Sequence, residues 1–292
     1  MKISGFTFVR NAIDLYYPVV EAITSILPIC DEFIVAAGDS TDGTTELLRG
    51  IHDPKIKIIE TVWDPAQFVR GASNAQQTNI ALEACTGDWA FYLQADEVVH
   101  EDDLEPLVRR MRVLLDDRRV EGLLFDYLHF YGDYEHYQIA HGWYRREVRI
   151  VRTEIGVRSW KSAQGFRRHG QKLRVAPANA RIFHYGWVRP PRKMTRKDFA
   201  LRSVHTGVPQ ARETVPDLDA DFDYGRLWGR ACFSGTHPRV MAKRIAEKDW
   251  EVTPTRSSRH RHDKLGNRLL SFVERTLGVR IGEHRNYTLL RS

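Results

Sequence analysis

The sequence predicts an α/β fold: a mixed, mainly parallel sheet flanked by helices, with a helical C-terminal extension. Up to residue 96, short apolar runs alternate with segments that carry apolar residues at helical spacing. This order is typical of parallel strands joined by helices that cover both faces of a sheet. Beyond residue 120, aromatic strand-like runs follow one another without long helices between them. We expect these later runs to add antiparallel strands to the same sheet.

The first half of the chain supplies four strands and the helices that connect them. Each predicted strand is an apolar or alternating run, and each predicted helix carries apolar residues on one face. We predict strands over residues 2–10, 32–39, 55–63 and 88–96, a turn and short helix over 40–50, and helices over 13–27, 71–88 and 102–117.

The second half is expected to divide into more strands and then a helical region. We predict strands over residues 120–134, 143–153 and 180–187, and helices over residues 190–205, 237–250 and 266–280. No internal repeat or long low-complexity linker interrupts the sequence, so we expect the C-terminal part to be packed rather than tethered. The expected units are a domain of residues 1–189 and a mostly helical extension of residues 190–292.

The charge balance excludes some partners and leaves others open. The chain has 44 basic and 38 acidic residues, interspersed, for a net charge of +6. Helix-turn-helix, zinc-finger and aromatic RNA-binding patterns are absent from the sequence, so we expect no nucleic-acid partner. A basic excess of this size fits an anionic small ligand, or peripheral association with an anionic membrane surface.

Cysteine usage favours a reducing compartment. Cys30, Cys85 and Cys232 are odd in number and widely separated, without metal-type spacing. We expect all three to be reduced and to pack as small buried hydrophobes. The sequence has neither an early stretch of signal-peptide form nor an apolar run that would span a membrane. The expected location is the cytoplasm, either free or at the inner face of the membrane.

Polar side chains close the fourth predicted strand. The apolar run of residues 89–93 stops at Gln94, Asp96 and Glu97. Open α/β folds bind ligands at the carboxyl edge of the sheet, where Asp96 would hold a divalent cation beside a diphosphate. The acidic residues 101–103 are better explained as the first turn of a helix, whose positive end favours carboxylates.

Four segments together resemble the family 2 glycosyltransferases, which have the GT-A fold. FVRN closes the first strand, GDSTDGT closes the second, RGASNAQQTNIALEACTGDW leads into the strand that ends in QADE, and RIFHYGW lies far downstream. In that family the second strand usually ends in a motif like DDGSTDGT, and the acidic strand ends in an Asp-x-Asp type motif. The resemblance covers the first 100 residues best and the HYG segment less closely.

The resemblance implies an inverting glycosyltransferase that uses a nucleotide diphosphate sugar as donor, with UDP or dTDP favoured. The acceptor stays open between a glycan, a lipid-linked molecule and a small molecule, and cell-envelope or polysaccharide biosynthesis is the implied setting. A divalent cation, Mn²⁺ or Mg²⁺, would assist the departure of the diphosphate. Residues 1–189 would form the catalytic domain that binds the nucleotide sugar.

Two positions depart from the family pattern. Gly38 stands where the family usually has an aspartate, and Asp39 follows it. The resemblance assigns Asp39 to the base or ribose, since a carboxylate accepts hydrogen bonds from imide or hydroxyl donors. The alternative is an aspartate that caps the following helix or shapes its turn, and Asp42 is the better candidate for the cap. Gln94 occupies the first motif position, where a neutral amide suits a hydroxyl better than a cation.

His184, in the HYG segment, is the expected second metal ligand beside Asp96. A neutral imidazole binds divalent transition metals, and related enzymes commonly complete the site with a histidine on a late strand. A structural hydrogen-bonding role is the alternative for His184. Gly186 would allow close backbone approach to a ligand, and Glu97 is a candidate partner behind Asp96.

Phe8, Arg10 and Arg70 are the other residues expected around the nucleotide. Each arginine follows an apolar segment at a predicted loop, and guanidinium suits phosphate in charge and geometry. A solvated surface position is the alternative for each. The basic run of residues 189–197 lies where a mobile loop would close on the diphosphate, with a solvated helix face as the alternative.

The sequence does not identify the base that an inverting enzyme needs to take the acceptor proton. Family members often supply an acidic residue after the acidic strand. We prefer Asp126, which stands on a predicted strand among aromatics suited to sugar rings. The other candidates are Asp133, Glu135 and Glu147, with His129 behind them.

A nucleotidyltransferase and a non-catalytic binding protein are the rival functions. A nucleotidyltransferase would carry a glycine-rich basic loop after the first strand, and FVRNAIDLYY has none. A non-catalytic nucleotide-sugar or carbohydrate-binding protein remains open, because Gln94 weakens the metal motif and the base is unassigned.

Overall fold

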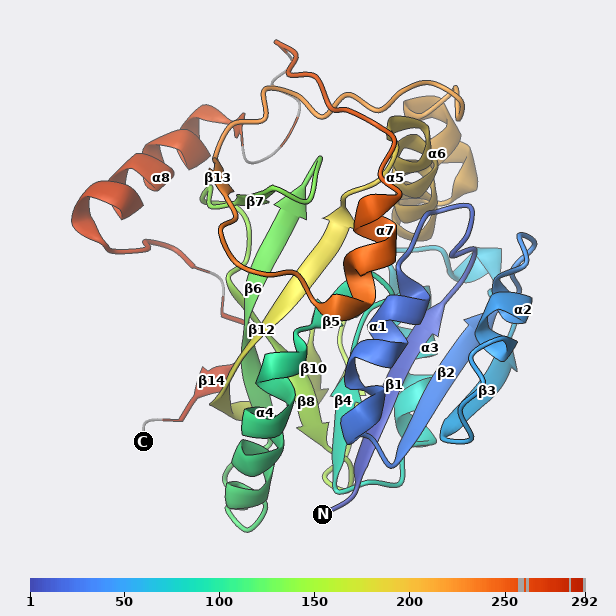
Figure 1. The fold of residues 1–292 in the computed structure, drawn as a ribbon, viewed down its shortest axis with the longest axis vertical. Coiled ribbons are helices and arrows are strands. Elements are labelled where there is room, and N and C mark those ends of the chain that lie inside the picture. Colours follow the sequence, from blue (N-terminus) through green and yellow to red (C-terminus); the bar gives the residue numbers. More distant parts are fainter. Residues whose placement is uncertain (257–259, 261–262, 284, 291–292) are drawn as a thin grey trace.

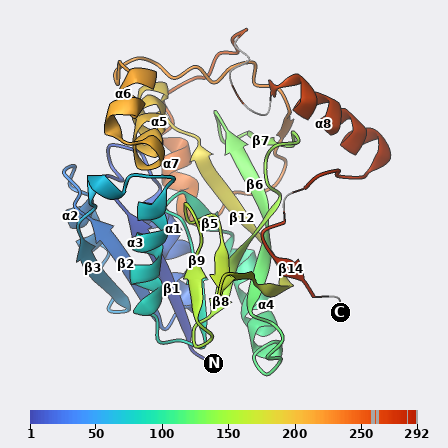
Figure 2. The same ribbon diagram turned by 180° about the vertical axis from the view of Figure 1, so that it is seen from behind.

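The computed structural model describes residues 1–256, 260, 263–283 and 285–290. Within them, a large mixed sheet forms the centre of the molecule, with helices on both faces (Figures 1 and 2). The first half contains β1 (Ile3–Val9), α1 (Val19–Ile26), β2 (Glu32–Gly38), α2 (Thr44–Arg49), β3 (Ile56–Thr61), α3 (Ala72–Glu83), β4 (Trp89–Tyr92), β5 (Glu97–Val99) and α4 (Glu101–Val113), with 3₁₀ helices at Leu27–Ile29 and Pro65–Gln67.

The parallel part of the sheet follows the predicted alternation of strands and helices. Its order is β4-β1-β2-β3, and Phe6 pairs with Tyr92 on one side and Ile34 on the other. All three side chains are buried, as expected for strands covered on both faces. Helices α1 and α4 lie on one face and α3 on the other (Figures 1 and 2). The prediction of a mixed, mainly parallel sheet flanked by helices is confirmed.

The first helix is shorter than predicted. Residues 12–16 form turns, Tyr17 is in neither a turn nor a helix, and α1 begins at Val19 with Pro18 at its cap position. Proline has no N–H to donate and is favoured at the start of a helix rather than in its interior. The residues before Pro18 are therefore free to line the edge of the sheet.

The second half adds β6 (Gly122–Tyr131), β7 (His136–Gln138), β8 (Arg146–Arg152) and β12 (Arg174–Trp187), while β9 (Val157–Ser159), β10 (Phe166–Arg168) and β11 (Gln171–Lys172) form a small separate sheet. Strand β8 pairs antiparallel with both β4 and β6, as expected. The antiparallel prediction is wrong for residues 180–187 beside β6, because β12 runs parallel to that strand. The segment that contains the small sheet joins the end of β8 to the start of β12, which lie at the same end of the main sheet on opposite sides of β6, and residue patterns do not indicate this connection.

Strand β12 also pairs antiparallel with β5, and this pairing positions the candidate site. In its register His184 lies opposite Glu97. The HYG segment is thereby placed against the QADE turn, although the two are far apart in sequence.

The C-terminal region contains α5 (Pro191–Thr206), α6 (Val208–Thr214), β13 (Arg230–Cys232), a 3₁₀ helix (Arg239–Met241), α7 (Ala242–Ala246), α8 (Leu265–Leu277) and β14 (Thr288–Leu289). Helices α5 and α8 match the predicted segments, whereas only residues 239–246 of the predicted helix 237–250 are helical. Strands β13 and β14 join the main sheet through β7 and β12. None of the helices in the described part of the chain is both long and apolar enough to cross a membrane.

The three cysteines have different surroundings. Cys30 and Cys85 are buried free thiols, as expected. Cys232 is exposed, which corrects the expectation for that residue, because β13 lies at the edge of the sheet with few residues over it.

Candidate functional site

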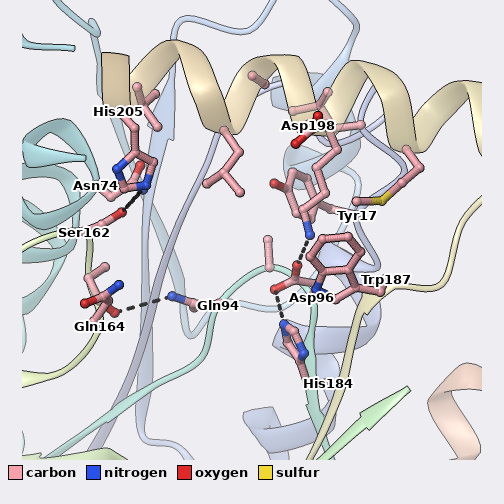
Figure 3. A pocket seen from close by; sticks show the side chains of 18 of the residues that line it. Tyr17, Asn74, Gln94, Asp96, Ser162, Gln164, His184, Trp187, Asp198 and His205 are labelled. Carbon is pink, nitrogen blue, oxygen red and sulfur yellow. Dashed lines mark hydrogen bonds and ion pairs between the residues drawn. The ribbon is translucent and has the colours of Figure 1, made fainter. Parts of the chain in front are cut away.

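A cleft of about 1170 Å³ opens at the carboxyl ends of the parallel strands. It is lined by the ends of β1 and β4, by β12, by helix α5 and by the segment that follows α8. Polar side chains from these elements converge inside it (Figure 3). This is the edge of an α/β sheet at which ligands bind.

Asp96 lies in the turn between β4 and β5 and is surrounded by cations. Lys197, on α5, donates hydrogen bonds to Asp96 Oδ2 at 2.8 Å and to the Gly186 carbonyl oxygen at 2.7 Å. Arg189 Nη2 lies 3.9 Å from the same carboxylate oxygen. Burial works to raise the pKa of Asp96, but these positive charges hold it well below its usual range. Asp96 is therefore ionised at neutral pH.

Lys197 is itself buried between like and unlike charges. Burial and the neighbouring Arg189 lower the pKa of Lys197 to about 8, against the opposing effect of Asp96. Its ammonium group also lies 5.2 Å from the centre of the Tyr17 ring. At neutral pH Lys197 is still mainly charged and is bonded to the acidic turn.

His184 faces the other oxygen of Asp96. Its Nε2 lies 3.8 Å from Asp96 Oδ1, and Figure 3 shows the two side chains pointing toward one another. Its Nδ1 lies 2.9 Å from Nδ1 of His129, whose Nε2 lies 2.7 Å from the Tyr144 carbonyl oxygen. Three polar groups thus form one continuous chain behind Asp96.

The hydrogen-bond chain determines the tautomer of each histidine. A backbone carbonyl only accepts, so the His129 proton is on Nε2. Burial lowers the pKa of both imidazoles, that of His129 well below its ordinary value, so both are neutral. His129 Nδ1 then accepts from His184 Nδ1–H, which leaves His184 Nε2 with a free lone pair. That lone pair faces the Asp96 carboxylate, and the two atoms are close enough to bind one divalent cation.

Gly186 makes this arrangement sterically possible. A Cβ at this position would lie 2.5 Å from His184 Nε2 and 3.0 Å from Asp96 Oδ2. The space beside Gly186 is thus taken by the His184 ring and the Asp96 carboxylate, and the predicted close approach of a ligand to this backbone stays a prediction.

Glu97 supports the site from below. It is fully buried and accepts two hydrogen bonds from Arg149, at 2.7 and 2.8 Å, and one from the Tyr127 hydroxyl at 2.8 Å. It also accepts one from the Gln94 backbone N–H at 3.1 Å, and the Gln94 side chain lines the cleft. Glu97 therefore holds the QADE turn in shape.

Arg10 lies at one corner of the cleft beside an aromatic wall, and Asp39 is its ion-pair partner. Arg10 Nε lies 3.1 Å from Asp39 Oδ1, and the Trp63 backbone N–H donates to that oxygen at 3.2 Å. The Arg10 guanidinium lies over the Trp63 ring, and Phe8 packs beside it with ring centres 6.0 Å apart. Phe8, Arg10 and Trp63 line the cleft, whereas the predicted binding residue Asp39 is exposed and is not among the lining residues; it contacts two of them, Arg10 and Trp63.

Trp63 explains the glycine that replaces the usual aspartate. A Cβ on Gly38 would lie 2.5 Å from Trp63 Nε1 and 3.1 Å from the Arg10 Cβ. The Trp63 ring fills the space that a side chain at residue 38 would need. Asp42 accepts hydrogen bonds from the Thr44 N–H and hydroxyl at the start of α2, but the cap position predicted for Asp42 is occupied by Gly43.

Two predicted positions lie elsewhere than expected. Arg70 is exposed and is not among the residues that line the cleft; its backbone N–H donates to the His205 carbonyl. Asp126, the preferred base, is exposed on the face of β6 opposite Tyr127 and is also absent from the lining. Strand alternation causes this, because successive side chains point to opposite faces.

Of the other base candidates, Glu147 lies in the cleft. Its Oε2 is shielded from solvent and has no hydrogen-bond partner among the described residues. Burial raises the pKa of Glu147 to about 7, and the charge of Glu97 adds to this, against the lowering effect of Arg149. An ionisable group in a cleft with a pKa near neutrality is a candidate acid or base.

Asp133 and Glu135 lie outside the cleft. With His136 they form a group of three possible ligands in the described chain, within 4.8 Å of one another. Asp133 is already paired with Arg230 Nη1 at 2.9 Å and with His136 Nδ1 at 2.9 Å. These contacts hold a turn near β7 and β13, so the prediction of either residue as base is not supported by its position.

Sequence reasoning missed Lys197, Trp63 and Tyr17 as individual site residues. Lys197 belonged to the basic run 189–197, whose pattern also fits a solvated helix. Trp63 is the last residue of a predicted strand, which gives no signal of a functional role. Tyr17 fell within a predicted helix, and only Pro18 signals that the chain is not helical there.

Comparisons with known proteins place the chain in a family. The profile described as "Glycosyl transferase family 2" matches residues 11–173, more than half of the 292 residues. A search of curated proteins finds no match. Residues 11–173 include Asp39, Asp96 and Glu147, whereas His184 and Lys197 lie beyond the matched segment.

Matches among solved structures include two synthases and TarS. Mannosyl-3-phosphoglycerate synthase from Rubrobacter xylanophilus is 16% identical with a TM-score of 0.32, over 44% of this chain and 41% of that one. S. aureus TarS 1-349 in complex with UDP-GlcNAc is 12% identical with a TM-score of 0.40, over 70% and 66%. Glucosyl-3-phosphoglycerate synthase from Mycobacterium tuberculosis, in complex with Mn²⁺, UDP and glucosyl-3-phosphoglycerate, is 19% identical with a TM-score of 0.30, over 45% of each chain. The chain thus spans less than half the length of the first and third of these proteins.

Proposed function

The chain belongs to glycosyl transferase family 2, and from this we propose that it is an inverting glycosyltransferase that uses a nucleoside diphosphate sugar as donor. A divalent cation, Mn²⁺ or Mg²⁺, fits a site of this kind and would neutralise negative charge on the departing diphosphate. The donor class we favour is a UDP or dTDP sugar. Residues 1–189 would be the catalytic domain, with the extension of residues 190–292 supplying Lys197.

The observation that carries the proposal is the pair formed by Asp96 Oδ1 and His184 Nε2. Both atoms offer lone pairs, both lie at the cleft surface, and they are 3.8 Å apart. A carboxylate and a neutral imidazole are ligands that Mn²⁺ accepts. The second carboxylate oxygen is bonded to Lys197, which fixes the orientation of Asp96. The sequence prediction of a metal pair at these two residues stands as a proposal with this geometry behind it.

The corner of Arg10, Asp39 and Trp63 would hold the nucleotide. Asp39 has carboxylate oxygens beside the cleft wall, suited to a ribose hydroxyl or a base N–H. Phe8 and Trp63 supply an aromatic wall for the base, and Arg10 supplies positive charge toward the phosphates. Gln94, at the cleft floor, is suited to a sugar or ribose hydroxyl.

Glu147 replaces Asp126 as our proposed base. In its deprotonated form it would accept the proton of the acceptor hydroxyl as that oxygen attacks the anomeric carbon and the diphosphate leaves. A pKa of about 7 makes the carboxylate available near neutral pH while keeping it basic enough to take a proton. Its buried, unpaired Oε2 is the kind of polar atom that a bound hydroxyl would satisfy.

Asp96→Asn is the direct test of the proposal. Purified protein is incubated with UDP-, dTDP- and GDP-sugars with and without Mn²⁺, and release of the nucleoside diphosphate is measured. The native chain should release it in a cation-dependent way, and Asp96→Asn should lower the rate at least about a hundredfold, as expected for loss of a charged group that stabilises the leaving diphosphate. Asp133→Asn, in the carboxylate group outside the cleft, is the matched control and should behave as native.

Two outcomes would contradict parts of this proposal. Tight, cation-independent binding of a nucleotide sugar without any turnover would favour the non-catalytic binding protein. Unchanged turnover in Asp96→Asn with added Mn²⁺ would remove the metal assignment.

We also propose a cytoplasmic location, in line with free Cys30 and Cys85.

A further inference from the structure

Helix α8 is packed with its polar side against the protein. Asn267, Ser271 and Glu274 recur at helical spacing and so lie on one face. Ser271 Oγ accepts a hydrogen bond from the His141 N–H at 2.7 Å. Glu274 accepts hydrogen bonds from Arg280 at 2.9 and 3.0 Å and from Arg145 at 3.4 Å. The face that an amphipathic helix usually turns to solvent is here the one that contacts the fold.

The apolar side of α8 consequently points to solvent. Leu265, Leu269 and Phe272 follow the same helical spacing and are 83%, 63% and 58% exposed. The stripe continues past the helix end with Leu277, Val279 and Ile281, also exposed. Both overall views show α8 at the outer edge of the molecule, and no other helix or strand of the described residues lies beyond it (Figures 1 and 2). A contiguous apolar surface of this kind marks an interaction site.

The charges around the stripe indicate which partner it fits. Lys264 and Arg275 are exposed on α8 and its cap, and the helix has a single acidic residue, Glu274, which faces inward and is paired with arginines. The outward surface of α8 is therefore apolar and positively charged. Amphipathic helices with this distribution bury their apolar face at the boundary of an anionic bilayer. A second copy of the chain is disfavoured, since it would bring the same basic residues together.

We propose that the apolar face of α8, with the segment up to Ile281, docks on an anionic lipid surface. The segment after α8 also lines the cleft, through Arg280, Gly282 and Glu283. Docking would place this side of the cleft next to the lipid headgroups. This arrangement suits an acceptor that is carried in the membrane, an inference that rests on the proposed function.

Vesicle partition of the full-length protein tests the proposal. Co-sedimentation is measured with phosphatidylcholine vesicles and with phosphatidylcholine vesicles that contain phosphatidylglycerol. The native chain should bind the anionic vesicles more tightly. Leu269→Gln/Phe272→Gln should weaken that binding at least about tenfold, because two apolar side chains no longer enter the interface. Lys264→Gln/Arg275→Gln should weaken it by about fivefold per charge, with little effect on neutral vesicles.

Val113→Gln is the matched control, since Val113 is 72% exposed at the end of α4, away from α8. It should bind vesicles as the native chain does. All variants should keep the native melting temperature, because the exchanged side chains are exposed. Equal partition of the native chain and the α8 variants would overturn the proposal. So would a native dimer that Leu269→Gln/Phe272→Gln converts to monomer with vesicle binding unchanged, which would assign the face to a second copy.

The same proteins separate this proposal from the proposed function. Thermal shift with UDP and Mn²⁺ is measured on each variant without vesicles. The α8 variants should keep the native shift. A native chain that binds vesicles but shows no nucleotide response would contradict the proposed function and leave the lipid-docking face supported.

Discussion

The histidine chain behind Asp96 makes a prediction about metal affinity at a residue that does not touch the metal. His129 is buried and links the Tyr144 carbonyl to His184. His129→Leu removes the acceptor that holds the His184 proton on Nδ1, so the proton is free to occupy Nε2, the atom that faces Asp96. Loss of a group that orients a metal ligand typically costs about 10- to 100-fold in affinity, or about 1.4 to 2.7 kcal/mol.

His129→Asn is the matched control. The side-chain oxygen of asparagine can take the place of Nδ1 and accept from His184, but it does not reach the Tyr144 carbonyl. Both variants therefore leave that carbonyl unpaired, at a cost of about 1–3 kcal/mol of unfolding free energy. Only His129→Leu also removes the acceptor for His184. Both variants lose the same stability, so a difference between their Mn²⁺ affinities reports the tautomer of His184.

The assay is direct binding of Mn²⁺ in the presence of UDP, followed by the loss of the free-ion electron paramagnetic resonance signal. His129→Leu should bind at least about tenfold more weakly than His129→Asn, which should stay close to the native affinity. Equal Mn²⁺ affinity for the native chain and both variants would refute the reasoning. Equal weakening of both variants would show that packing, and not the proton position, governs the site.

Three further changes test other parts of the cleft. Glu147→Gln should lower kcat at least about a hundredfold. The rate of the native enzyme should rise with pH through about 7 as the Glu147 carboxyl ionises. A native pH–rate profile that stays flat there would exclude Glu147 as the base. Gly186→Ala should abolish most Mn²⁺ binding, since its Cβ would meet the metal pair, whereas Gly266→Ala, with open space around it, should bind normally. Arg10→Ala should weaken UDP binding about tenfold, as measured by calorimetry, because one hydrogen bond to a charged group is lost. Arg70→Ala should leave UDP binding unchanged. Equal effects of the two variants would contradict the proposal that Arg10 contacts the nucleotide.

The sequence predicted the strand ends of the cleft because apolar runs that stop at polar residues are a local signal. Asp96 and His184 were brought together by the family resemblance, and their contact depends on the pairing of β5 with β12. The sequence predicts Asp96 toward the ligand and Glu97 behind it, but the physical reason for these directions lies in a long-range contact. Asp96 faces the cleft while its neighbour Glu97 turns into the core, because the partner of Glu97 is Arg149, 52 residues later.

The wrong assignment of the base has a similar origin. Residues 126 and 127 lie on opposite faces of β6, and the sequence contains aromatics on both, so alternation alone does not tell which face meets the cleft. Tyr127 bonds to Glu97 beneath the site, which sends Asp126 to the outside. Glu147 reaches the cleft from β8, whose antiparallel register beside β6 is a long-range feature. Local residue patterns predict where such strands lie in the sequence. They do not predict how the strands pair, and the pairing determines which side chains come into contact.

The neutral Gln94 in the acidic motif is understandable from the charges that the fold adds. A motif with two carboxylates would repel a diphosphate until a cation neutralised it. Here Glu97 forms a buried ion pair with Arg149, so Asp96 is the carboxylate that faces the cleft from this turn. Lys197 and Arg189 oppose it with two positive charges within 3.9 Å. The turn is thus positive in sum before any metal binds, which favours a polyanionic donor, and the basic run that follows HYGW contributes to the site through its buried members, not through a solvated face.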